Sequence, residues 1–190
     1  MQKIVFINIF AISMIAIILI GGTVPAYIGA ASAETRNTTE SRLQRLEDRE
    51  AIQQLLTDYG RFLDRRDFAS FAQLFAEKNG EWIGGMGKAQ GSQAIRKLME
   101  DTIGKSTGKA SAPDFHLFTN EMIQVNGDHA DATTKWIFVV QGEGGRPQPL
   151  YLGHYEDSMV REGGRWKFLR RVVHADIPGD DALSKKQTGS

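Results

Sequence analysis

Histidine is the side chain in this sequence that is best suited to exchange a proton near neutral pH, and the chain has four of them. They are His116, His129, His154 and His174. An imidazole, with a pKa of about 6.5, can take up and return a proton, which elimination and enolisation both require. His116 is the strongest candidate for this role. A lone histidine on a strand is nevertheless more often structural, so its function depends on what surrounds it.

The residue content argues against several other kinds of site. The chain contains no cysteine, which excludes disulfides, thiolate metal sites and a cysteine nucleophile. No helical or hairpin spacing groups His116, His154 and His174 as ligands, so we expect no metal site. The glycine-rich run 84–87 lacks the Lys-Ser/Thr of a phosphate loop, and no cofactor is expected.

Charge is balanced along the chain, with 23 basic and 23 acidic residues. This balance provides no general basic excess for nucleic acid, and we expect no nucleic-acid partner. Basic residues do gather near the C-terminus, at 165–171. They form either a solvated face paired with Asp157, Glu156 or Glu162 across a hairpin, or a site for an anionic ligand group, with Arg171 the best candidate.

The first 33 residues have the order of a signal peptide. Lys3 precedes an apolar run over 4–20, and Pro25 precedes the small-residue site 31–33. We expect cleavage after Ala33, export to the periplasm or medium, and no membrane contact afterwards. The alternative is an uncleaved anchor, because the apolar run approaches the roughly 20 residues that span a bilayer. Either arrangement places the folded domain outside the cytoplasm.

Helical patterns occupy the first half of the remaining chain. Residues 34–40 are polar and unpatterned and are predicted to be a linker. Apolar spacing of three and four then predicts a helix from Ser41, its N-cap, to about residue 64. Asp67 is predicted to cap a short helix over 68–75, and a third helix is expected over 92–103. A short strand is predicted between them at 81–83.

After Pro113 the apolar period changes to two. Four strands are predicted, over 115–125, 130–141, 149–161 and 165–175, followed by a flexible tail over 179–190. Turn residues at 126–128 and 162–164 suit tight hairpins. Helices followed by an antiparallel meander predict an α+β domain over 41–178, in which helices pack on a strongly curved antiparallel sheet and enclose a pocket.

Several short stretches between Leu46 and Pro178 resemble, in order and spacing, the SnoaL-like, nuclear-transport-factor-2-like superfamily, which includes scytalone dehydratase and bile-acid 7α-dehydratase. The resemblance implies a cone-shaped fold with a deep pocket, and usually a homodimer. The stretches include Asp48-Arg49-Glu50-Ala51-Ile52, Tyr59-x-x-x-Leu63-Asp64, Phe71-x-x-Leu74-Phe75-Ala76, Gly80-Glu81-Trp82, His116-x-x-Thr119-Asn120, Gly127-Asp128-x-Ala130, Gly153-x-Tyr155-x-Asp157 and Gly164-Arg165-Trp166-x-Phe168-x-x-Arg171.

The resemblance also implies catalytic roles, because dehydratase members place a tyrosine, an aspartate and a histidine where Tyr59, Asp64 and His116 stand here. His116 would act as the base, Asp64 would orient it, and Tyr59 would donate to a developing enolate oxygen. Five residues along an ideal helix do not share a face, however, so Asp64 is also interpretable as a turn residue and Tyr59 as core. The second acid of bile-acid dehydratase is missing after Trp136, and its arginine is not matched at Ala175.

The expected function is therefore that of an exported protein that binds a small apolar or aromatic molecule. It would act as a cofactor-independent lyase (dehydratase) or isomerase, or as a non-catalytic ligand-binding or dimerisation module. The small subunit of a ring-hydroxylating dioxygenase shares the fold, but export argues against that hypothesis. The residues expected to bind the ligand are Trp82, Phe118, Trp136, Phe138, Tyr155, Arg171 and His174.

Overall fold

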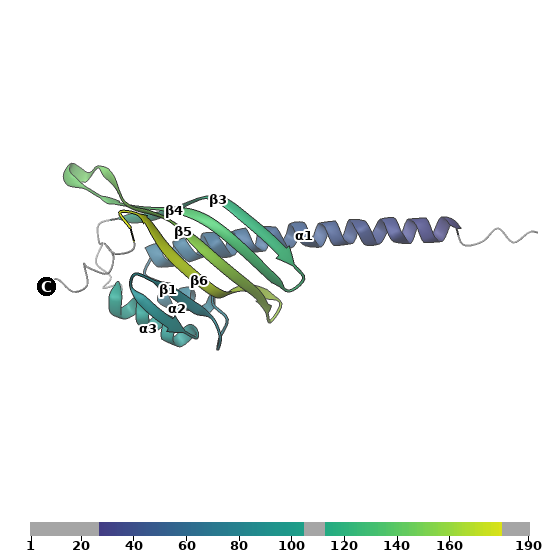
Figure 1. Ribbon diagram of the computed structural model, residues 1–190, viewed down its shortest axis with the longest axis horizontal. Helices are drawn as coiled ribbons and strands as arrows, with labels where there is room; N and C mark the ends of the chain where they lie inside the picture. Colours follow the sequence, from purple (N-terminus) through teal and green to yellow (C-terminus); the bar gives the residue numbers. More distant parts are fainter. Residues whose placement is uncertain (1–26, 105–112, 180–190) are drawn as a thin grey trace, which may run out of the picture. The chain divides into compact units, whose positions relative to one another are not determined.

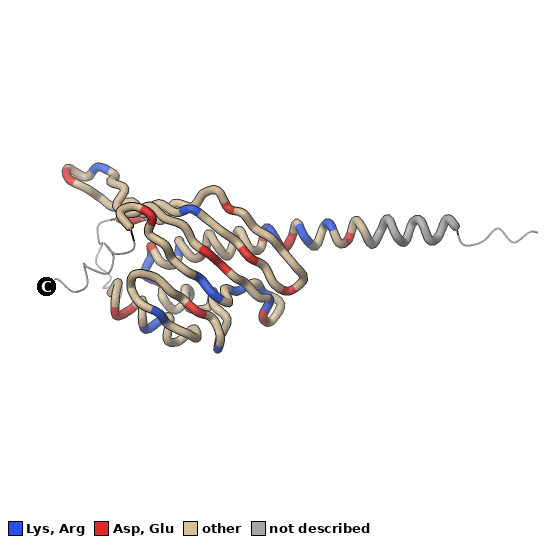
Figure 2. The backbone as a smooth tube through the Cα atoms, viewed as in Figure 1, with Lys and Arg blue, Asp and Glu red and all other residues tan. Residues whose placement is uncertain are grey.

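The computed structural model describes the backbone of residues 27–104 and 113–179, with side chains from residue 38 onward. The chain divides after Thr39 into two units, and the second, Glu40–Ser190, contains all of the described strands. Along the described chain, Lys and Arg are interspersed with Asp and Glu (Figure 2). The predicted tail over 179–190 lies almost wholly outside the described residues.

The first helix, α1 (Tyr27–Asp64), begins earlier than the sequence pattern predicted. Residues 34–40 are helical and do not form a linker, and Ser41 lies inside the helix and is not its N-cap. The helix continues through this polar stretch because no glycine or proline interrupts the chain between residues 30 and 59. Most of the predicted signal peptide, 1–33, lies outside the described residues. Within the described residues, no helix combines the length and apolarity that crossing a bilayer requires.

Two short helices and a small hairpin follow α1. Helix α2 (Phe68–Gln73) begins after Asp67, whose carboxylate accepts a hydrogen bond from the Ser70 amide at 3.1 Å, which confirms the predicted N-cap. Strands β1 (Glu81–Gly84) and β2 (Gly87–Gln90) pair antiparallel, and helix α3 (Ser92–Thr102) comes next. Strand β2 was not predicted because its sequence, Gly-Lys-Ala-Gln, has no β-branched or aromatic residue.

Four long strands complete one six-stranded sheet, with the order β2-β1-β6-β5-β4-β3 (Figure 1). Strands β3 (Asp114–Asn126), β4 (His129–Gln141), β5 (Pro147–Glu162) and β6 (Arg165–Ile177) lie within about two residues of their predicted bounds. The connection between β4 and β5 contains a 3₁₀ turn, η1 (Glu143–Gly145). The α+β prediction is confirmed, although the sheet is mixed, because β1 pairs parallel with β6.

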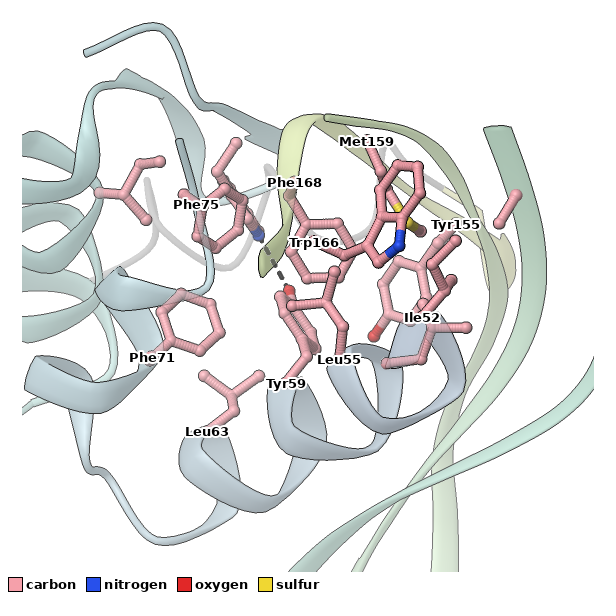
Figure 3. Packing of buried hydrophobic residues seen from close by; sticks show 14 of the residues in the cluster. Ile52, Leu55, Tyr59, Leu63, Phe71, Phe75, Tyr155, Met159, Trp166 and Phe168 are labelled. Atoms are coloured by element: carbon pink, nitrogen blue, oxygen red, sulfur yellow. Dashed lines mark hydrogen bonds between the residues drawn. The ribbon is translucent and has the colours of Figure 1, made fainter. Parts of the chain in front are cut away.

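The two faces of the sheet differ in burial. On β5, Tyr155, Asp157 and Met159 are buried, whereas the alternating His154 and Glu156 are accessible. We call these the inner and the outer face. Figure 3 shows α1 side chains meeting the inner face, which forms one apolar core; the residues labelled there are Ile52, Leu55, Tyr59, Leu63, Phe71, Phe75, Tyr155, Met159, Trp166 and Phe168.

A buried ion pair lies in the centre of this core. Arg171 Nε and Nη2 donate to the two carboxylate oxygens of Asp157 at 2.7 and 2.6 Å, and the side chains are 1% and 0% exposed. The guanidinium carbon lies 4.0 Å from the ring centroid of Tyr59 and 4.1 Å from those of Tyr155 and Phe168. Burial alone would lower the pKa of Arg171, but the charge and hydrogen bonds of Asp157 raise it, so the guanidinium stays charged.

A second buried carboxylate joins α1 to the end of the sheet. Asp48 Oδ1 accepts hydrogen bonds from Gln44 Nε2 at 3.0 Å, Arg161 Nη2 at 2.5 Å and Trp166 Nε1 at 3.3 Å. Burial works to raise the pKa of Asp48, but the hydrogen bonds from Arg161, Gln44 and Trp166 outweigh it and lower the pKa. Asp48 is thereby held to Arg161 and Trp166, from which it is separated by 113 and 118 positions in the sequence.

Replacing Asp157 with Asn should destabilise the domain by about 3–5 kcal/mol, because it leaves the Arg171 charge buried without a counter-charge. Urea denaturation of the wild type and the variant measures this loss. The double variant Asp157→Leu/Arg171→Met, which removes both charges, should lose less than the sum of the two single changes. Additive losses would show that the two side chains do not interact.

Candidate active site

Asp64 and His116 are in direct contact between the end of α1 and the start of β3. The Asp64 Oδ1 atom lies 2.5 Å from His116 Nδ1, and Oδ2 accepts a hydrogen bond from the His116 backbone amide at 3.1 Å. The two side chains are 19% and 13% exposed, respectively. A carboxylate against Nδ1 holds the ring and its proton, which leaves Nε2 as the nitrogen that can exchange a proton with a substrate.

The backbone at the end of α1 accounts for the position of Asp64. The amide of Arg66 bonds to the carbonyl of Leu63 at 3.0 Å, and that of Asp67 bonds to the carbonyl of Phe62 at 2.9 Å, with Arg66 in the left-handed region at φ 57°. This is a Schellman motif. A carboxylate at a helix C-terminus is disfavoured by the helix dipole, so Asp64 does not serve the helix itself. Its side chain bonds to β3 instead.

Two further contacts hold the end of α1 against β3. The Arg66 guanidinium forms an ion pair with Asp114, at the start of β3, and also donates to the Leu63 carbonyl at 2.9 Å. Gly60 allows close approach, because a Cβ there would lie 2.7 Å from a ring carbon of Phe118 and 3.5 Å from His116 Cβ. Sequence reasoning missed both residues. The sequence offered two signals for them: Gly60 lies inside an apolar helical stripe, and Arg66 follows the end of that stripe.

Two aromatic rings lie close to His116. The Phe138 ring centroid lies 4.7 Å from that of His116, and the Phe118 centroid lies 6.4 Å away. Tyr151, which sequence reasoning did not select, stacks on Phe138 at 6.4 Å. Phe118, Phe138 and Tyr151 are all partly exposed. Of the residues expected to bind a ligand, Phe118 and Phe138 are therefore the ones that the structure brings to His116.

Tyr59 lies in the aromatic core and is 2% exposed. Its hydroxyl accepts a hydrogen bond from Trp82 Nε1 at 2.9 Å, and its ring contacts Tyr155 at a centroid distance of 5.5 Å. Trp136 stacks on Tyr155 at 5.7 Å. Burial raises the pKa of Tyr59 and, further still, that of Tyr155, so both hydroxyls keep their protons at neutral pH. The proposed role of Tyr59 as a hydrogen-bond donor stays a prediction.

The two remaining candidates lie apart from His116. Arg171 pairs with Asp157 across the hairpin, as one interpretation predicted, but it is buried and not on a solvated face. Its role toward an anionic ligand stays a prediction. His174 alternates with the inner residues Val173 and Ala175 and is paired with His154 on the outer face. The structure therefore does not bring His174 to the Asp64–His116 pair.

Comparisons with known proteins agree with this architecture. The family model for a SnoaL-like domain matches residues 44–172. An uncharacterised protein of Mycobacterium tuberculosis is 29% identical over 129 residues, which cover 67% of this chain and 84% of that protein.

Solved structures show the same fold. A nuclear-transport-factor-2-like protein with a cystatin-like fold, from Novosphingobium aromaticivorans, superposes with a TM-score of 0.66 at 24% identity, covering 77% of this chain and 95% of that one. A protein from the same organism, described as a candidate scytalone dehydratase, gives a TM-score of 0.56 at 25% identity, covering 72% and 87% of the two chains. These likenesses confirm the predicted fold.

Replacing Arg66 with Gly or with Ala removes its ion pair with Asp114 in both cases, but only glycine adopts the left-handed backbone without strain. We expect Arg66→Ala to be less stable than Arg66→Gly by about 1 kcal/mol. Urea denaturation of the two variants measures the difference. Equal stability would mean that the end of α1 does not hold residue 66 in the left-handed conformation.

Proposed function

Because this chain belongs to the SnoaL-like family, we propose that it binds a small apolar or aromatic molecule and that His116 transfers a proton on it with the help of Asp64. The fold is one that supports ligand binding or catalysis without a cofactor. The observation that carries the catalytic proposal is the 2.5 Å contact between Asp64 Oδ1 and His116 Nδ1. A carboxylate at this distance from Nδ1 supports Nε2 as the nitrogen that would exchange a proton.

The proposed reaction uses His116 as the base and Asp64 as its partner. His116 Nε2 takes the proton from a carbon next to a carbonyl, and the C–H electron pair moves into an enolate, while Asp64 stabilises the imidazolium that forms. If the enolate is conjugated with a C=C bond, return of the proton to the far carbon of that bond moves the double bond, which is isomerisation. If the substrate carries a β-hydroxyl, the enolate electrons form a C=C bond as the C–O bond breaks, and return of the proton to the departing hydroxide releases water, which is dehydration.

The rings beside His116 support a flat, apolar substrate. Phe138, Phe118 and Tyr151 offer flat apolar surface, which suits a ring system carrying a carbonyl group.

Tyr59 would donate to the enolate oxygen in the proposed mechanism. Because Tyr59 is 2% exposed, this donation requires the aromatic core around it to open.

A second candidate function is a binding or dimerisation module without catalysis. The observation that favours it is the burial of Tyr59, Trp82, Tyr155 and Arg171, each at most 2% exposed. Residues that were expected to line a pocket are packed against one another here. A ligand would then be bound at the rim, beside Phe118 and Phe138, without being transformed.

We also propose that two copies of the chain pair through the outer face. The strand register places Leu117, Ile137, Leu152 and Ile177 in one row across β3, β4, β5 and β6. Leu117 is 54% and Ile177 61% exposed, and Phe115 beside them is 54% exposed. Covering such a row removes apolar surface from water, which favours association.

The catalytic proposal predicts proton exchange that depends on His116. The full chain is screened by thermal shift against steroids, phenolic lactones and polyketide-like aromatic ketones, and the stabilising class is then incubated in D₂O. NMR should show deuterium entering next to the carbonyl, with His116→Ala slower by about 100-fold or more. Asp64→Asn should slow exchange about tenfold or more, whereas the distant control His129→Ala should not.

Each result of this experiment separates the two functions. Binding without exchange in the wild type would overturn the catalytic proposal in favour of the binding module. Exchange that continues unchanged in His116→Ala would remove His116 from the mechanism.

The pairing proposal predicts a dimer in sedimentation of the full chain at micromolar concentration. Leu117→Asp should shift the protein to a monomer, because it places a charge in the apolar row. Leu46→Asp is the matched control, since Leu46 is 65% exposed on α1 and lies outside the row. A wild-type monomer at these concentrations would refute the proposal.

A further inference from the structure

Three side chains gather on the outer face of the sheet, apart from the proposed active site. His154 on β5 and His174 on β6 are directly opposite each other in the strand register. Glu156 lies two residues beyond His154 on the same strand, so its side chain points to the same face. One ligand atom of each residue lies within 4.8 Å of the others. The sequence did not reveal this cluster because strand register brings its members together.

The histidines present the same nitrogen to one carboxylate. His154 Nε2 lies 4.0 Å from Glu156 Oε1, and His174 Nε2 lies 3.6 Å from Glu156 Oε2. The two imidazole rings stack with centroids 4.5 Å apart and an angle of 12° between their planes. The cluster therefore offers two imidazole nitrogens and a carboxylate around one point.

A second carboxylate orients the first histidine from behind. His154 Nδ1 lies 2.9 Å from Asp176 Oδ1 and 3.0 Å from Asp176 Oδ2. A carboxylate that holds the Nδ1 proton fixes the ring and makes Nε2 the coordinating nitrogen, which is the usual arrangement behind a metal-bound histidine. Asp176 thus provides the carboxylate that would hold the His154 ring in place behind a bound metal ion.

We propose that His154, Glu156 and His174 bind a divalent transition-metal ion, with Zn²⁺ as the first choice, and that Asp176 is a positioning residue for His154. Two histidines and one carboxylate are a zinc donor set that leaves a fourth position open. Donor atoms around tetrahedral Zn²⁺ lie about 3.4 Å apart at the usual bond lengths. The side chains are 35%, 56% and 31% exposed, so they can close this distance by rotation.

A groove borders two of the three side chains. His154 and Glu156 line a surface groove of about 570 Å³ together with Lys135, which is opposite His154 on β4. A water molecule or a small anion in this groove can complete the coordination of the ion. Lys135 provides positive charge on the same side, which favours an anion in that position.

The test uses the full chain without a histidine tag, freed of metal by a chelator and titrated with ZnCl₂ in a calorimeter. The wild type should bind Zn²⁺ stoichiometrically and should give visible absorption bands with Co²⁺. His154→Ala, His174→Ala and Glu156→Gln should each weaken Zn²⁺ binding at least about tenfold, and Asp176→Asn should weaken it about 10- to 100-fold. His129→Ala and His116→Ala are the controls and should bind as the wild type does.

Two results would overturn the proposal, provided that circular dichroism shows the proteins to be folded. One is the absence of Zn²⁺ binding by the wild type. The other is unchanged binding by His174→Ala, which would leave the cluster as ion pairs alone. Since the binding measurement does not involve proton exchange, its outcome is independent of the catalytic role of His116.

Discussion

The pairing of Arg171 with Asp157 is the constraint on which the rest of the domain depends. Two buried charges are costly unless they are paired, so β5 and β6 must keep the register that brings Arg171 Nε and Nη2 to the Asp157 carboxylate. The rings of Tyr59, Tyr155 and Phe168 then close around the guanidinium. Since Tyr59 belongs to α1, the same interaction sets the depth at which this helix lies on the sheet.

The position of the helix in turn determines where chemistry is possible. The middle of α1 is buried in the core, and its C-terminal end contacts β3. There the Schellman motif and the Arg66–Asp114 ion pair hold Asp64 beside His116. The Asp64–His116 pair is therefore partly accessible, whereas the aromatic residues Tyr59 and Tyr155 are not. This separation places the Asp64–His116 pair at the border of the packed core.

The alternation of side chains along the strands gives the two faces of the sheet different properties. Inner residues of β5 build the ion pair and the core, whereas outer residues of the same strand join the apolar row and the histidine cluster. The proposed proton transfer, pairing of copies and metal binding thus depend on different side chains of one sheet.

The local patterns of the sequence determined the four long strands, the Asp67 cap and the order of helices before strands, because each depends on neighbours a few residues away. The resemblance of short motifs to the SnoaL-like superfamily predicted that Asp64 and His116 act together. Tertiary structure alone decided the extra strand β2, the parallel pairing of β1 with β6, the burial of Arg171 and the meeting of His154, Glu156 and His174. These features depend on register and on how deeply a strand is covered, and both are set by contacts between residues far apart in the chain.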